Sequence, residues 1–130
     1  ATYDPKYLIA AAELVEKMGM LDRLVCGTDI MGDFKMHEIQ GMEVAWRAKH
    51  FGSYQALRQA TGNCCELFKL CTYRDPYPDG EVGTLRAGSF ADLLIVKENP
   101  LENAGQLGDP SSILLIMKDG DVYKNNLGGC

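Results

Sequence analysis

The first 30 residues combine a helical spacing of apolar residues with an unbroken apolar run. Apolar side chains recur every three or four residues between Pro5 and Gly19, which predicts a helix that Asp4 caps and Gly19 ends. The run Leu24–Cys26 shows no alternation and is typical of a strand covered on both faces, as in a parallel sheet between helices. A helix, a short turn and a buried strand form half of an α/β repeat.

Helical spacing continues up to about residue 70. After a predicted loop at 30–35, one helix is expected over 36–49, with its apolar residues on a single stripe. Gly52 then interrupts the pattern, and Ser53 is placed to cap a helix over 53–60. Thr61 is placed to cap a further helix with buried apolar positions.

The pattern changes after residue 72. Tyr73–Gly80 is rich in turn-forming residues, and the segments beyond it have the composition of strands, at Ala91–Val96, Ile113–Met117 and Val122–Lys124. Asp119-Gly120 predicts a type I′ hairpin turn between the last two strands, because both residues tolerate positive φ angles. The chain therefore divides into an α/β part, residues 1–71, and a small β part, residues 72–130.

Composition limits the classes of function. The 130 residues are 46% hydrophobic and 24% charged, as in an ordinary globular domain, and the net charge of −5 argues against nucleic acid as a partner. No apolar run approaches the roughly 20 residues of a membrane-spanning helix, and the first residues do not resemble a signal peptide. Five cysteines without a CxxC motif favour free thiols in a reducing compartment, so a cytoplasmic location is expected.

The segment Val25–Asp29 carries the main candidate for chemistry. An apolar strand runs into a Gly-Thr bend and ends on a carboxylate, Asp29, and α/β barrel enzymes place catalytic groups at the C-terminal ends of their strands. The alternative is that Asp29 only caps a helix or binds loop N–H groups. Asp33, four residues on, forms either a supporting acidic pair with Asp29 or an ordinary turn residue.

Many short motifs beyond Asp29 follow one another in a fixed order. They are Gly27-Thr28-Asp29, His37, Glu43, Ala56-Leu57, Ala60-Thr61-Gly62-Asn63, Leu67, Leu70, Gly83, Leu85, Gly88, Ala91–Val96, Asn99-Pro100-Leu101 and Lys118-Asp119-Gly120. The ordered set resembles the C-terminal portion of the amidohydrolase superfamily, most closely its imidazolonepropionase and Xaa-Pro dipeptidase-like branch. The resemblance implies the last strand and closing helices of a (β/α)8 TIM barrel, with Leu24–Thr28 as the eighth strand. It also implies the C-terminal strands of a small β-sandwich.

The resemblance further implies hydrolysis of C–N bonds in amides, cyclic amides or peptides by water activated on one or two divalent metal ions, with zinc expected. Asp29 would be a metal ligand and a proton shuttle. His37 would line the mouth of the site and contact substrate, although a surface or capping role is the alternative for this residue. Glu43 would hold the loop through hydrogen bonds. The other metal ligands would lie outside these residues. A prolidase-like dipeptidase or carboxypeptidase specificity is the alternative, based on the Pro-Tyr-Pro segment before Gly80 and the tail at 117–124.

Two other classes of function remain. One is a non-catalytic folding or binding module. The other is a thiol protein, which is supported only by the adjacent cysteines Cys64 and Cys65. Against the module, a single barrel strand cannot cover its own faces and half a sandwich leaves its edges open. The expected partners are therefore the remainder of the barrel and a small amide or dipeptide substrate, and a homo-oligomer is left open.

Overall fold

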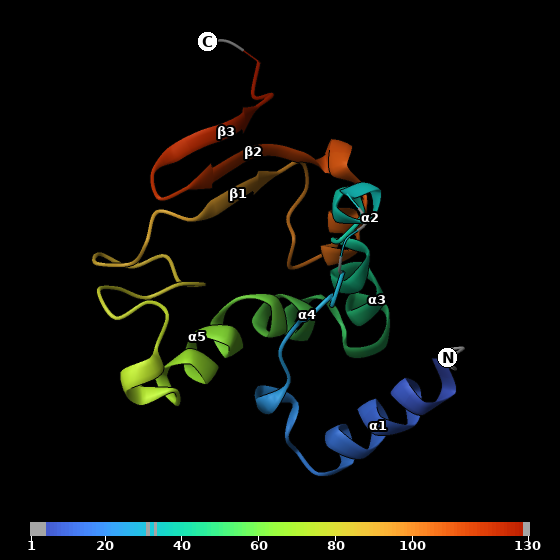
Figure 1. Cartoon of the computed structure of the whole chain (residues 1–130). Helices are drawn as coiled ribbons and strands as arrows, with labels where there is room; N and C mark the ends of the chain where they lie inside the picture. Colours follow the sequence, from blue (N-terminus) through green and yellow to red (C-terminus); the bar gives the residue numbers. More distant parts are fainter. Residues whose placement is uncertain (1–4, 31, 33, 129–130) are drawn as a thin grey trace.

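A computed structural model describes residues 5–30, 32 and 34–128 (Figure 1). Its first helix, α1 (Pro5–Lys17), ends as the sequence predicts. Gly19 has a φ angle of 66°, and the N–H of Met20 donates to the carbonyl of Val15 over 3.0 Å, which together close the helix in a left-handed turn. The predicted cap Asp4 and the predicted pair member Asp33 lie outside the described residues.

The predicted strand Leu24–Thr28 is not a strand here. The short 3₁₀ helix η1 (Leu21–Arg23) leads into an unpaired segment, which Figure 1 shows passing beside the helices. Its N–H groups bind helices instead, because no other strand lies beside it among the described residues. The eighth-strand interpretation therefore describes a conformation that would require neighbouring strands, and no barrel forms within the described part of the chain.

The single helix predicted over 36–49 is two helices. Helix α2 (Phe34–Glu38) begins inside the predicted loop at 30–35, and α3 (Met42–Phe51) begins after a turn. Gly41, at the break, lies against the backbone of Leu107, where a side chain would collide with the Leu107 carbonyl. The break thus lies at a contact with a segment 66 residues away, which local periodicity does not reveal.

Helices α4 (Ser53–Ala60) and α5 (Gly62–Lys69) lie where they were predicted, but neither predicted cap forms. The Ser53 hydroxyl accepts a hydrogen bond from the Ala104 N–H at 3.1 Å, so it ties α4 to the 3₁₀ helix η3 (Ala104–Gly108). The Thr61 hydroxyl donates to the Leu57 carbonyl at 2.7 Å and closes the end of α4. The Ser53 hydroxyl thus makes a tertiary contact, and the Thr61 hydroxyl bonds the preceding helix, so neither caps the helix that follows it.

The second part of the chain forms one antiparallel sheet in the order β1-β2-β3 (Figure 1). Strands β1 (Leu93–Val96), β2 (Ile113–Lys118) and β3 (Asp121–Asn125) match the predicted strands closely. The hairpin turn has the predicted positive φ angles, 53° at Asp119 and 85° at Gly120. Ahead of the sheet, a short 3₁₀ turn, η2 (Thr72–Arg74), overlaps the turn-rich segment, and an isolated bridge joins Glu81 to Ser89 just after it.

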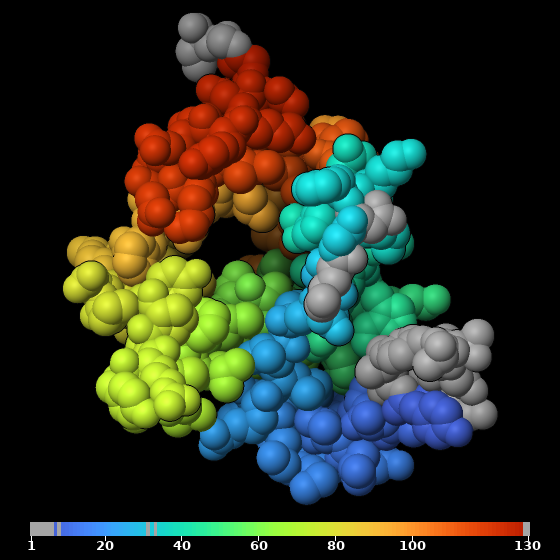
Figure 2. Space-filling view, in the orientation of Figure 1, coloured from blue at the N-terminus to red at the C-terminus, as the bar shows by residue number. Residues whose placement is uncertain are grey.

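Few side chains are buried, and those that are lie mainly between α3, α4, α5 and η3. The buried apolar residues among those described are Ala56, Cys65, Ala104 and Leu115. The accessible surface is 9313 Å², whereas a compact folded protein of 14.3 kDa is expected to expose about 6,800 Å². Figure 2 shows a hollow in the middle of this face, between the sheet and the helices. The chain therefore leaves far more surface uncovered than a compact domain does.

No helix within the described residues has the length and apolar character needed to cross a membrane.

Candidate functional site

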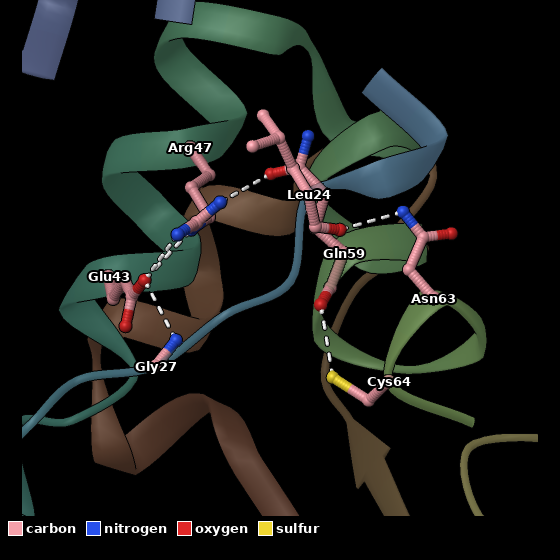
Figure 3. Close-up of polar contacts among 7 residues, drawn as sticks. All are labelled: Leu24, Gly27, Glu43, Arg47, Gln59, Asn63 and Cys64. Carbon is pink, nitrogen blue, oxygen red and sulfur yellow. Dashed lines mark hydrogen bonds and ion pairs between the residues drawn. The ribbon is translucent and has the colours of Figure 1, made fainter. Parts of the chain in front are cut away.

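The segment that leads to Asp29 is held at its start by α5. Asn63, which is 2% exposed, donates its side-chain amide to the carbonyl of Leu24 at 2.8 Å (Figure 3) and to that of Leu21 at 3.3 Å. Leu24 directly follows η1, and the Leu21 carbonyl at the start of η1 also accepts from the Leu24 N–H at 3.3 Å. The buried amide of Asn63 thus fixes the point at which the chain leaves η1.

The next two peptide groups bind α4 and α3. The Cys26 N–H donates to the Gln59 carbonyl at 2.9 Å, and the Gly27 N–H donates to Glu43 Oε1 at 3.2 Å. Gln59 lies in the last turn of α4, where a backbone carbonyl accepts no hydrogen bond from its own helix. Glu43 therefore holds the backbone through a hydrogen bond, as predicted in kind, but at Gly27 within the predicted strand and not in the loop at 30–35.

Arg47 joins these two anchors (Figure 3). Its Nε and Nη2 donate to Glu43 Oε1 at 2.9 and 2.7 Å, and its Nη1 donates to Gln59 Oε1 at 2.7 Å. Gln59 is fully buried, and the Arg47 and Glu43 side chains are 15% and 19% exposed. Charge-assisted bonds of this kind are strong and directional, so α3 and α4 are locked together at this point.

Two thiols lie beside the same cluster. Cys64 Sγ donates to the Gln59 carbonyl at 3.3 Å, so this carbonyl receives both Cys26 N–H and the Cys64 thiol. Burial raises the pKa of Cys26 to about 11, more than the nearby Arg47 guanidinium lowers it. Burial also raises the pKa of Cys64. Because the thiolate is the reactive form, both groups are poor nucleophiles at neutral pH, and a thiol-based function loses its support.

Asp29 follows two residues after the anchored Gly27. Its φ angle is 49°, a left-handed conformation that aspartate adopts more readily than most residues do, and the residue is exposed. A non-glycine residue in this conformation is a common feature of functional sites. The structure thus presents Asp29 at the open end of an anchored segment.

The structure does not gather further ligands around Asp29. His37 lies in α2, exposed, with its ring 6.4 Å from that of Phe34. Within the described residues, no three histidine, cysteine, aspartate or glutamate side chains come together as a metal site. A divalent ion held by protein needs about three or more such ligands. Asp29 fits the chemistry of one ligand, but the donor set of a metal centre is not present in these residues.

The clearest pocket lies elsewhere. It has a volume of about 220 Å³ beside η1 and α5, and its charged lining residues are Asp22, Arg23, Arg58 and Glu66. Neither Asp29 nor His37 lines it. The depression therefore does not mark the chemistry expected from the sequence.

Sequence reasoning missed three members of the anchoring cluster, Arg47, Gln59 and Asn63. A signal for Arg47 was present, because it stands four residues after Glu43 on one helix, a spacing that brings opposite charges together. Gln59 and Asn63 are polar residues on the buried faces of their helices, and a buried polar side chain has to find a partner. The identity of those partners depends on tertiary packing.

The chain resembles several solved structures. No family model and no curated protein matches it. The crystal structure of an amidohydrolase is 27% identical, with a TM-score of 0.72 over 92% of this chain and 26% of its own. A prolidase crystallised with N-methylphosphonate-L-proline is also 27% identical, with a TM-score of 0.72 over 90% of this chain and 26% of its own. An ochratoxinase from A. niger, 24% identical with a TM-score of 0.53 over 70% of this chain and 20% of its own, shares the fold alone.

The first neighbours agree with one another and cover almost all of these residues. The 130 residues span about a quarter of the length of each of those two chains. The ordered motifs around Asp29 and in the β part agree with this likeness. Along nearly its whole length, the chain is similar to structures of the amidohydrolase superfamily.

Proposed function

We propose that these residues are part of a hydrolase of C–N bonds in which Asp29 is the functional carboxylate. The observation that carries the proposal is the likeness to an amidohydrolase and a prolidase over at least 90% of the chain. The position of Asp29 supports it, because the residue ends a segment whose peptide groups are anchored to α3 and α4. Neither argument depends on a pocket within the described residues.

In this proposal residues 1–71 belong to a barrel and residues 72–130 to a β-sandwich domain. The uncovered surface supports membership in these larger domains, since the chain exposes about a third more area than its mass predicts. The remainder of the barrel would cover it. The exposed edges of the sheet would pair with further strands for the same reason, because unpaired edge groups seek partners.

The chemistry assigned to Asp29 is proton transfer. A carboxylate within hydrogen-bond reach of an attacking water accepts its proton and returns it to the leaving nitrogen. A divalent metal, with zinc expected, would supply activation of the water when bound. Asp29 would contribute one oxygen ligand to it, and the other ligands would come from outside these 130 residues. His37 would contact substrate at the mouth of the same site.

Peptides ending in proline are the first substrate class to test. The reason is the prolidase neighbour, whose bound ligand is a phosphonate analogue built on L-proline. Amides in rings are the second class. Both classes break a C–N bond at a planar carbonyl carbon, so one carboxylate serves either reaction.

The decisive experiment replaces Asp29 by asparagine in the longer protein that contains these residues, with alanyl-proline as the probe. Asparagine also tolerates left-handed φ, so Asp29→Asn removes the charge without straining the backbone. We expect kcat to fall by about 100-fold or more, the range for loss of a general base. Circular dichroism and Tm should stay unchanged.

Asp119→Asn is the matched control. Asp119 has the same left-handed conformation, with φ of 53°, and lies in the hairpin of the β part. Its substitution should leave kcat within twofold of the parent. Equal activity of the Asp29 variant and this control would refute the role of Asp29. Hydrolysis of neither alanyl-proline nor a cyclic amide by the parent protein would favour a non-catalytic module.

A further inference from the structure

The anchors of the Asp29 segment form a closed ring of hydrogen bonds. From the Gly27 N–H the ring passes through Glu43 Oε1 to Arg47 and on to Gln59 Oε1 (Figure 3). It closes through the Gln59 carbonyl, which accepts from the N–H of the neighbouring Cys26. Both the side chain and the backbone of Gln59 take part. We infer that Arg47 is the positioning residue of this ring, and that the ring sets where Asp29 stands.

The geometry makes Arg47 the hub. The guanidinium offers several donors in one rigid plane, and here it bonds Glu43 through two nitrogens and Gln59 through a third. The bonds to Arg47 leave Glu43 Oε1 facing the Gly27 N–H. A lysine would supply a point charge but could not hold both oxygens in fixed directions. The orientation of the Gly27 acceptor therefore depends on Arg47.

Distance along the chain makes the ring matter for Asp29. Gly27 is two residues before Asp29, so only Thr28 separates the anchored N–H from the residue that carries the carboxylate. Glycine has the widest conformational freedom of any residue, and a hydrogen bond to its N–H limits that freedom. A misplacement of a reacting group by about 1 Å can reduce a rate by about a hundredfold. This inference rests on the proposed function for its kinetic effect, but not for its structural one.

The test separates positioning from stability by using paired variants. Glu43→Leu removes the acceptor of the Gly27 N–H and leaves Arg47 unpaired, whereas Glu43→Leu with Arg47→Leu removes both charges. Replacing a buried ion pair by apolar residues is often neutral for stability, although breaking one partner is not. We expect the double variant to recover the Tm lost by the single variant. It should not recover function, because the Gly27 N–H still lacks its acceptor.

Two readouts are taken on the full-length protein. Hydrogen exchange of the Gly27 amide should be at least about tenfold faster in both Glu43→Leu and the double variant, since the bond that protects it is gone. With alanyl-proline, kcat should fall about tenfold to a hundredfold in both, with KM within threefold. Glu43→Gln keeps an oxygen acceptor and should restore slow exchange and most of kcat.

Lys69→Leu is the control for loss of an ion pair elsewhere. Lys69 bonds Glu81 at 2.7 Å, the same length as the Arg47–Glu43 contact, on α5 away from the ring. Its substitution should leave exchange at Gly27 and kcat unchanged.

The possible failures differ in what they overturn. Slow Gly27 exchange in Glu43→Leu, or recovery of kcat together with Tm in the double variant, would overturn the positioning role. Faster exchange combined with full activity of Asp29→Asn would leave the ring in place and overturn the proposed function of Asp29.

Discussion

Helices α4 and α1 both have amphipathic sequences, but other elements cover the apolar face of α4, whereas that of α1 is exposed. In α4, Ala56 and Gln59 are fully buried against α3 and η3. In α1, Leu14 is 58% exposed and Met18 is 60% exposed. Figure 1 shows α1 at the side of the molecule, away from the sheet.

The contrast teaches what an amphipathic pattern encodes. It encodes that one face of a helix will be covered, but not whether the cover lies in the same stretch of chain. For α4 the covering residues belong to α3, α5 and η3, all within the described part of the chain. For α1 the cover is not supplied by the described residues, which agrees with a chain that spans about a quarter of its structural neighbours.

The largest expected effect on stability comes from breaking the link between α3 and α4. Arg47→Leu leaves the mostly buried Glu43 carboxylate without its charged partner. Loss of one member of a buried pair reduces the free energy of unfolding by about 3 kcal/mol. Urea unfolding measures it, and an unchanged midpoint would show that the two helices are held by apolar contacts alone.

The rates at which individual thiols react provide a second measure of the contrast between covered and exposed regions. With a pKa of about 11, Cys26 at pH 8 has a thiolate fraction about a hundredfold below that of an ordinary cysteine. Iodoacetamide should therefore modify the exposed Cys71 well before Cys26, as peptide mass mapping over time would show. The rate at Cys26 should increase with pH up to about 11. Equal rates at pH 8 would mean that the Cys26 segment opens freely.

Alanine-to-leucine substitutions compare the two helices directly. Ala56→Leu inserts a large side chain at a position with no exposed surface and should reduce the free energy of unfolding by about 2 kcal/mol. Ala11→Leu, at an exposed position of α1, is the matched control and should change it by less than about 0.5 kcal/mol. Thermal unfolding of both variants decides, and similar losses in the two would erase the distinction.

The smallest effect is expected within α1. Leu14→Ala in the 130-residue chain should change the free energy of unfolding by less than about 0.5 kcal/mol, because Leu14 touches little. In a longer protein that covers α1, the same substitution should cost several times more. A large loss in the 130-residue chain would mean that α1 is already packed in solution.

The correct predictions rest on the conformational preferences of single residues and short segments. Asp119-Gly120 specified its turn through positive φ angles, Gly19 ended α1 in the same way, and the strands of the sheet were found by composition. Glu43 was assigned to loop support through the family resemblance, and the structure shows it bonding the backbone at Gly27 instead, before that loop.

Nonlocal contacts explain the errors. The break between α2 and α3 lies where Gly41 contacts Leu107, and the Ser53 hydroxyl accepts from the Ala104 N–H and does not cap α4. The segment predicted as a strand bonds helices, because none of the strands in the described part of the chain lies beside it. The partners of Arg47 and Gln59 lie in different helices, so no window of sequence contains them. The metal role of Asp29 and the substrate role of His37 stay predictions.

The close approach at Gly41 has a consequence for variation in this protein. Its φ of −62° is one that every amino acid adopts, so conformational preference does not select glycine there. Volume does, because even one methyl group would push the Leu107 carbonyl away from α3. In a saturation library, position 41 should tolerate no replacement, alanine included, although a survey of backbone angles would class it among the most permissive sites.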